Sequence, residues 1–308
     1  MKFTVGLPKN NPGFVDSVIK NSEHIYEVYF SWGDFPNGRS SHTRDENLSS
    51  WELMDIERNA LKKLSDNGIF LNLLFNANCY GVNSQSRAFF NKVGETVDYV
   101  MSSYGLKSVT TTSPLIAKFI KNNFEDVEVR ASVNMEIGTV QGMKYLSGYF
   151  DSFYMKRELN RDLESIGTLH KWCEENGKKL FMLANSGCLN FCSAHNFHDN
   201  LVAHEEEIAK MDNAYNFGGI CHEYLKNPEN YETLYENMNF VRPEDIDKYN
   251  GLFEAVKLAT RIHNNPGEVL ESYIRKKYSG DLLRLLEPAH SIYPYVMENG
   301  NPPGLRRL

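Results

Sequence analysis

Short strand-like runs alternate with longer stretches of helical periodicity along the chain, and this alternation limits the fold more than any other feature. Eight segments have the length and the β-branched or apolar composition of buried strands. They are residues 3–7, 25–30, 69–75, 108–112, 127–133, 149–155, 180–184 and 252–258. In the last segment Glu254 and Ala255 suit a helix equally well.

Two of the helices between these segments have clear boundary signals. Ser49 and Glu52 form a capping box ahead of an apolar stripe that stops before Gly68. Pro266 opens a second amphipathic helix, for which Gly280 is the expected stop. Eight strands with helices between them, over about 250 residues, predict an α/β fold of the TIM-like (β/α)8 barrel type. An open doubly wound sheet is the alternative.

We expect residues 1–308 to form a single barrel domain, interrupted between its seventh and eighth strands by a long cysteine- and histidine-rich insertion, 185–250. The chain has 308 residues, of which 41% are hydrophobic, enough for one large core. Its net charge of -7 gives no overall attraction for a phosphate backbone, so nucleic acid is not indicated as a partner. The absence of a secretory signal and of any apolar run of membrane-spanning length predicts a soluble, cytoplasmic protein.

The insertion concentrates potential metal ligands. Three of the five cysteines, Cys188, Cys192 and Cys221, lie within it, as do His195, His198 and His204. An odd number of cysteines in a chain of this kind favours reduced thiols or metal ligands over disulfides. The three thiols predict an iron–sulfur cluster, and a Cys3His zinc site completed by a histidine such as His198 is the alternative.

Barrel enzymes build their sites from the loops that follow the strands, so polar residues at predicted strand ends are the next candidates. Cys79 follows the third strand and is the first candidate for a fourth cluster ligand. Cys173 lies within a helical stretch, and we expect it to be a structural cysteine. The other polar residues at strand ends are Arg39, Ser40, Asn76, Asn78, Asn134, Glu136, Lys156, Arg157, Glu158 and Arg261. We expect Arg39, Arg157, Lys257 and Arg261 to hold an anionic substrate group at the catalytic site, or else to be solvated surface charges.

Several motifs resemble those of the collagenase-like U32 peptidase family. The segment 183–200, with its two cysteines, is similar to the cysteine loop of that family, and 239–245 is similar to its "(I/V)RPED" stretch. Residues 157–159 resemble "REL", 257–261 stand at the place of "KIxGR", 278–282 resemble "YDGNL", and 76–79 resemble an "NxxC" turn. Two departures are plain: no "HGAxC" run is present, and Thr260 replaces the glycine of the "KIxGR" motif.

The resemblance implies a TIM-type barrel and, as in several family members, a 4Fe-4S cluster held by cysteines. It implies either peptidase activity or oxygen-independent hydroxylation, with a small-molecule or peptide substrate and a protein partner or electron donor. From the residues themselves we favour an iron–sulfur enzyme of redox or group-transfer chemistry acting on a small or anionic substrate. The alternatives are a peptidase or peptide-binding protein with a structural zinc or cluster site, and a non-catalytic partner subunit. No HExxH or GxSxG motif supports the peptidase.

Overall fold

The computed structural model is a closed barrel of eight parallel strands, as the sequence predicts. It describes residues 1–38, 48–208, 210–211, 219–225, 227, 229–230 and 233–287, apart from the side chains of Glu206 and His222. The strands are β1 (Phe3–Gly6), β2 (Ile25–Phe30), β3 (Leu71–Phe75), β4 (Ser108–Thr111), β5 (Glu128–Ala131), β6 (Ser152–Tyr154), β7 (Lys179–Leu183) and β8 (Ala255–Leu258). They pair in sequence order, and β8 closes the barrel against β1.

All eight strand predictions are confirmed, including the eighth, whose composition also suits a helix. Ala255 and Lys257 can occupy a strand because β8 pairs with both β7 and β1, and these neighbours outweigh the helical propensity of the segment. The observed strands are shorter than most of the predicted runs, because apolar residues also occur in the loops before or after the paired residues.

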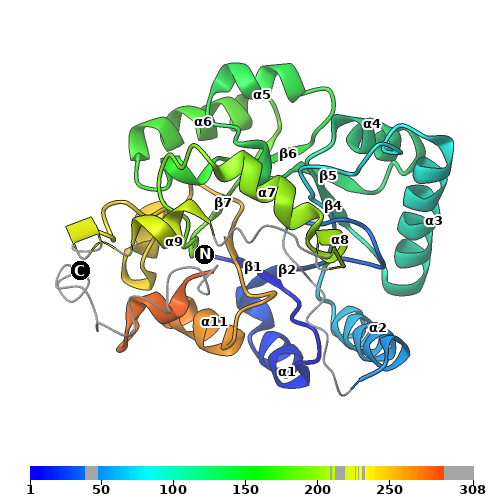
Figure 1. The fold of residues 1–308 in the computed structure, drawn as a ribbon, viewed down its shortest axis with the longest axis horizontal. Coiled ribbons are helices and arrows are strands. Elements are labelled where there is room, and N and C mark those ends of the chain that lie inside the picture. Colours follow the sequence, from blue (N-terminus) through cyan, green and yellow to red (C-terminus); the bar gives the residue numbers. More distant parts are fainter. Residues whose placement is uncertain are drawn as a thin grey trace.

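Helices surround the barrel (Figure 1). They are α1 (Pro12–Lys20), α2 (Ser50–Asp66), α3 (Arg87–Tyr104), α4 (Pro114–Asn123), α5 (Val140–Leu146), α6 (Leu163–Glu175), α7 (His195–Ala203), α8 (Glu205–Ile208), α9 (Ile220–Tyr224) and α11 (Pro266–Arg275). Short 3-10 turns occur at η1 (Ser22–His24), η2 (Val133–Met135), η3 (Arg157–Leu159), η4 (Pro243–Tyr249) and η5 (Leu282–Leu285). No described helix is long and apolar enough to cross a membrane.

The helix boundaries follow the sequence signals at one helix and depart from them at another. Ser49 and Glu52 make both hydrogen bonds of the capping box at the start of α2. Helix α11 opens at Pro266 but ends at Arg275, and the prediction that it continues to Gly280 is wrong. Lys276 takes the left-handed conformation, with a φ of 54°, and its backbone N–H caps the last turn.

The strands carry two sets of side chains. One set packs outward against the helices in a continuous hydrophobic core, as Val256 and Leu258 do. The other set points into the barrel and is strongly polar. Arg130 is fully buried there and pairs with Glu27 and Glu128, and Lys179 in turn pairs with Glu128 at 2.7 Å.

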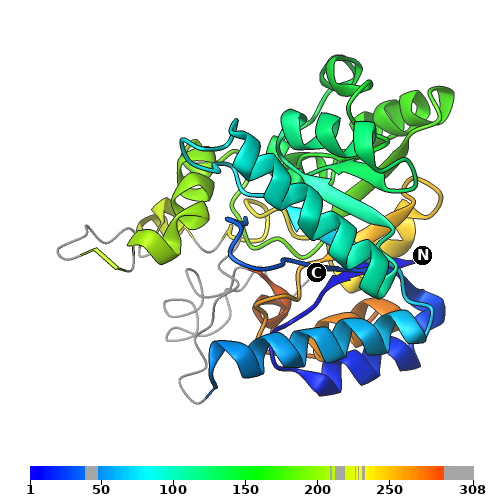
Figure 2. The ribbon, with the colours of Figure 1, turned by 90° about the vertical axis from the view of Figure 1, so that its right-hand side faces the viewer.

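The long segment between β7 and β8 contains α7, α8, α9 and η4. Seen from the side, α7 and α8 lie beyond one end of the barrel (Figure 2). Contacts from α7 to residues that follow β3 and β5 identify this end as the one where the strands finish. The predicted cysteine-rich segment therefore covers part of the barrel mouth.

Candidate functional site

Side chains from the ends of four strands meet at the barrel mouth. Asn134, after β5, donates from Nδ2 to the carbonyl of Asn76, after β3, at 3.3 Å. Arg157, after β6, donates to Asn134 Oδ1 at 3.2 Å and to the sulfur of Cys188, after β7, at 3.4 Å. The arginine is only 3% exposed, so its charge is directed at these partners and away from solvent. The predicted convergence of residues from separate strand ends is thus observed for this group.

Helix α7 lies over this group and adds a buried histidine. His195 Nδ1 lies 3.1 Å from Glu136 Oε1, and His195 Nε2 lies 3.4 Å from Asp199 Oδ2, one turn further along α7. Asp199 also lies 3.9 Å from Arg157. Burial, together with nearby Glu158, raises the pKa of Glu136. Sequence reasoning missed Asp199, although its spacing of four residues from His195 on a helix was a usable signal.

A second group at the mouth joins a thiol, an imidazole and a carboxylate. Cys79, after β3, lies beside the His204 side chain at the end of α7, and each of the two groups shifts the pKa of the other. His204 Nδ1 lies 2.7 Å from Glu207 Oε2 on α8. Since Nδ1 is engaged by the carboxylate, Nε2 is the nitrogen left for the thiol. We call these three residues the Cys79 triad.

The ionisation of the Cys79 triad is shifted toward a thiolate and an imidazolium. The neighbouring imidazole of His204 lowers the pKa of Cys79, and the backbone N–H of Gly81, 3.4 Å from the sulfur, acts in the same direction. The contacts of His204 with Cys79 and with Glu207 raise its pKa. These shifts are the ones that activate cysteine nucleophiles, because the thiolate is the reactive form.

Beside the Cys79 triad lies a cavity of about 540 Å³. This volume falls within the range of small-molecule sites, roughly 300–1,000 Å³. Its polar lining includes Asn78, Cys79, Thr112, Ser113, Asn134 and Asn196. Asn78 and Asn196 contact each other at 3.5 Å, so α7 closes one wall of the cavity. The cavity gives a ligand direct access to the thiol.

The predicted cluster ligands are distributed among different contacts. Cys188 accepts a hydrogen bond from Arg157, and Cys79 lies beside His204. Cys221 and His198 both lie beside Gly219: a Cβ placed on this glycine would lie 3.4 Å from the Cys221 sulfur and 3.6 Å from the His198 ring. Among the described residues, no three histidine, cysteine, aspartate or glutamate side chains are grouped closely enough to hold one metal ion.

Cys79 and Cys188, two of the predicted cluster ligands, thus have different neighbours in the described part of the chain. Cys192 is a half-buried free thiol in the loop before α7. Cys173 is buried on α6, 3.9 Å from the sulfur of Met143, and burial raises its pKa to about 12, which agrees with a structural role. Arg39 and Ser40 lie outside the described residues.

The remaining predicted residues, Lys257 and Arg261, lie on β8 and just after it. Both are nearly buried, with 7% and 6% of their surfaces exposed. The Lys257 ammonium lies 4.1 Å from the ring centre of Tyr29 and 5.3 Å from that of Tyr154. Lys257 thus projects into the barrel, and the prediction of a solvated surface charge is wrong for these two residues.

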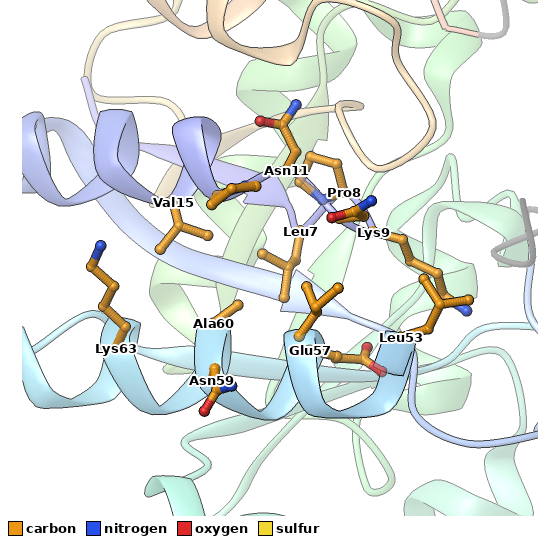
Figure 3. Close-up of a pocket in the computed structure, with 13 residues that line it drawn as sticks. Leu7, Pro8, Lys9, Asn11, Val15, Leu53, Glu57, Asn59, Ala60 and Lys63 are labelled. Atoms are coloured by element: carbon orange, nitrogen blue, oxygen red, sulfur yellow. The ribbon is translucent and has the colours of Figure 1, made fainter. Parts of the chain in front are cut away.

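A smaller cavity, of about 270 Å³, lies between the segment after β1 and the side of α2 (Figure 3). Leu7, Ile56 and Ala60 give it a largely aliphatic wall, and Lys9 and Glu57 add opposite charges. Burial raises the pKa of Glu57 to about 7, although Lys9 acts against the shift. This cavity shares no lining residue with the one beside Cys79.

Comparisons with known proteins agree with the fold and with the motifs. No family model matches the chain. An uncharacterized protease of Methanocaldococcus jannaschii is 22% identical over 289 residues, which cover 91% of this chain and 81% of that protein. The structure of a U32 peptidase superposes with a TM-score of 0.57 at 16% identity, covering 84% of this chain and 92% of that one, and it shows a shared fold. The resemblance of this chain to the U32 peptidase family, first indicated by its motifs, is thereby confirmed.

Proposed function

We propose that this protein is a thiol-dependent hydrolase of peptide bonds, in which Cys79 is the nucleophile, His204 the acid and base, and Glu207 the group that orients the imidazole. One observation carries the proposal: the Cys79 thiol lines a cavity of about 540 Å³ beside the imidazole of His204, whose Nδ1 lies 2.7 Å from Glu207. The names of the related proteins, a protease and a peptidase, favour the same class of reaction.

In the first step the Cys79 thiolate attacks the carbonyl carbon of a peptide bond. The imidazolium of His204 then gives its proton to the leaving amine, and the acyl group remains on sulfur as a thioester. A water molecule, deprotonated by His204, attacks the thioester and releases a carboxylic acid and the free thiol. The two steps consume one water and need no oxidant or reductant.

The cavity lining supplies groups suited to the negative charge that forms on the carbonyl oxygen. The amide side chains of Asn78 and Asn196 line the same cavity as the thiol, and amide N–H groups stabilise such an oxyanion. Asn134, also in the lining, is held by Arg157 and by the carbonyl of Asn76. We assign Asn78 and Asn196 to the oxyanion and Asn134 to the shape of the pocket.

The test is hydrolysis of a peptide library by metal-free protein, with products identified by mass spectrometry. Cys79→Ala should abolish cleavage, and His204→Gln should lower kcat by at least about 100-fold, the usual contribution of a general base. Cys192→Ser is the matched control, because it removes a nearby thiol outside the Cys79 triad. Cleavage that survives Cys79→Ala would refute the proposal.

An iron–sulfur protein of redox or group-transfer chemistry, including oxygen-independent hydroxylation of a small or anionic substrate, is the second candidate. It is supported by the density of cysteines in the segment after β7 and by the position of Cys221 and His198, two of the predicted ligands, on either side of Gly219. Zinc is the alternative occupant of that pair, since imidazole and thiolate are its usual ligands. We propose no reaction step through either group.

Iron and sulfide content per chain after anaerobic purification, with an EPR spectrum of the reduced protein, separates the two candidates. If the protein is the proposed hydrolase, it should contain no stoichiometric iron, and Cys79 should be the only cysteine whose substitution inactivates it. A cluster protein contains iron that Cys188→Ser, Cys192→Ser or Cys221→Ser removes. If Cys79→Ser also lost its iron, Cys79 would be a cluster ligand and could not be the nucleophile.

A further inference from the structure

The cavity beside the Cys79 triad lies across the ends of three neighbouring strands, β3, β4 and β5. Among its lining residues, Cys79 follows β3, Leu115 follows β4 at the start of α4, and Met135 follows β5 in η2. A hydrogen bond from the Thr112 hydroxyl to the carbonyl of Ala77 ties the end of β4 to the loop after β3. The thiol and the side chains after β4 and β5 therefore belong to one site.

The lining of this cavity includes apolar side chains that the proposed reaction does not use. They are Tyr80, Pro114, Leu115 and Met135. Hydrolysis of a peptide bond needs a nucleophile, an acid and base, and donors for the oxyanion, but it needs no apolar contact. Apolar surface at a binding site lowers the free energy of a complex when a ligand removes that surface from water. These side chains therefore concern the choice of substrate.

Leu115 is placed to contact a ligand, because the fold leaves it uncovered. It is 48% exposed, whereas Ile116 and Ile120 on the same helix are buried in the core. The start of α4 is held in place by Ser113, whose hydroxyl accepts from the Ile116 N–H at 3.3 Å, and by Pro114 at the first helical position. The Leu115 side chain is thus presented to the cavity from a well-defined helix start.

We propose that this site selects peptides with an apolar side chain next to the scissile bond, and that Leu115 determines the preference. The inference rests on the proposed hydrolase function, because it takes the cavity as the substrate site. The peptide group faces Cys79, and the substrate side chain packs against Leu115 and Met135. A cavity of about 540 Å³ holds both, since sites of this size enclose drug-sized ligands.

Two substituted iodoacetamides test the preference directly, because they alkylate Cys79 without any hydrolysis. The thiolate attacks the methylene carbon and iodide leaves, so the rate depends on how the N-substituent fits the cavity. The N-isobutyl and N-carbamoylmethyl compounds have the same shape and differ in polarity. Site-resolved mass spectrometry gives the ratio of their rates at Cys79, isobutyl over carbamoylmethyl. This ratio should be about tenfold higher in the folded protein than in urea, the usual effect of a small apolar group in a hydrophobic pocket.

Leu115→Ser should remove most of this tenfold difference, and its rate with the carbamoylmethyl compound should stay that of the unchanged protein. Leu163→Ser is the matched control, because Leu163 is 46% exposed in the first turn of α6 and is not part of the cavity lining. Both variants should fold, since exposed substitutions have small effects on stability. An equal ratio in folded protein and in urea, or an unchanged ratio in Leu115→Ser, would overturn the inference.

The alkylation experiment and the hydrolysis test fail independently. If peptides are cleaved but the alkylation ratio is not raised, the hydrolase stands and the apolar preference is wrong. If no peptide is cleaved, the hydrolase is refuted, and a raised ratio still identifies an apolar subsite beside the thiol. If both hold, apolar residues should adjoin most cleavage sites in the peptide library, and Leu115→Ser should lower kcat/KM for those peptides.

Discussion

At the scale of single residues, the chemistry of this protein depends on side chains whose ionisation is set by one or two neighbours. Cys79 and Cys173 show the contrast. The neighbouring imidazole of His204 lowers the pKa of Cys79, whereas burial raises the pKa of Cys173 to about 12. The same functional group is thus placed for reaction in one position and for packing in the other.

The rate of Cys79 alkylation by iodoacetamide should reveal the thiolate directly. Cys79 should react at pH values below those at which an ordinary thiol, with a pKa of about 8.5, reacts. His204→Gln should slow the reaction at pH 6.5 by about tenfold for each unit by which the pKa of Cys79 rises. Site-resolved mass spectrometry measures the rate, and Cys192→Ser serves as the control. An unchanged rate in His204→Gln would show that the imidazole does not set the ionisation.

At the scale of elements, helix α2 begins where its capping signal predicts, but that local signal does not predict how the helix packs. Its capping box forms as predicted, because both hydrogen bonds between Ser49 and Glu52 lie within the first turn of the helix. The packing of α2 was not predictable in this way. Glu57, in the middle of the helix, lies against the segment after β1, where the aliphatic cavity of Figure 3 raises its pKa to about 7.

Glu57 should make the protein less stable as the pH rises from about 5 to 8. Its pKa is higher in the folded state than its ordinary value of 4.5, so its contribution is fully present below pH 4.5 and is lost as the pH rises through about 7. Glu57→Gln should remove this slope and gain about 2 kcal/mol relative to the unchanged protein at pH 8. Urea unfolding at several pH values measures the difference.

Glu95→Gln, an exposed substitution on α3, is the matched control for Glu57→Gln and should follow the unchanged protein at every pH. Parallel curves for Glu57→Gln and the unchanged protein between pH 5 and 8 would contradict the buried environment of Glu57.

At the scale of the whole molecule, the polar interior of the barrel joins strands that are distant in the sequence. Arg130 on β5 contacts Glu27 on β2 across the barrel, and Lys179 on β7 contacts Glu128 on β5. Burial alone raises the pKa of Glu128, but Arg130, Lys179 and Ser152 outweigh it and bring the pKa down to about 2. The closed barrel is therefore held in part by carboxylates that must stay ionised.

Glu128 should contribute to resistance against acid. Because its folded-state pKa lies below its ordinary value of 4.5, its contribution is present above pH 4.5 and is lost as the pH falls toward about 2. Glu128→Gln should cost up to about 3 kcal/mol at pH 7, and the difference from the unchanged protein should disappear toward pH 2. Glu125→Gln, an exposed neighbour, should have no such effect. An equal loss at pH 7 and pH 2 would show that packing, and not charge, is responsible.

The sequence by itself determined the eight strands, the start of α2 and the position of Arg157 and Cys188 at the barrel mouth, because periodicity, capping and strand-end position are local properties. Only the tertiary structure brought Cys79 to His204 and Glu207. Cys79 is distant from both in the chain and becomes their neighbour when the segment after β7 folds over the end of β3. It also placed Lys257 inside the barrel, against the rings of Tyr29 and Tyr154. Burial and partners decide what a thiol or an amine does, and both depend on contacts that no local pattern encodes.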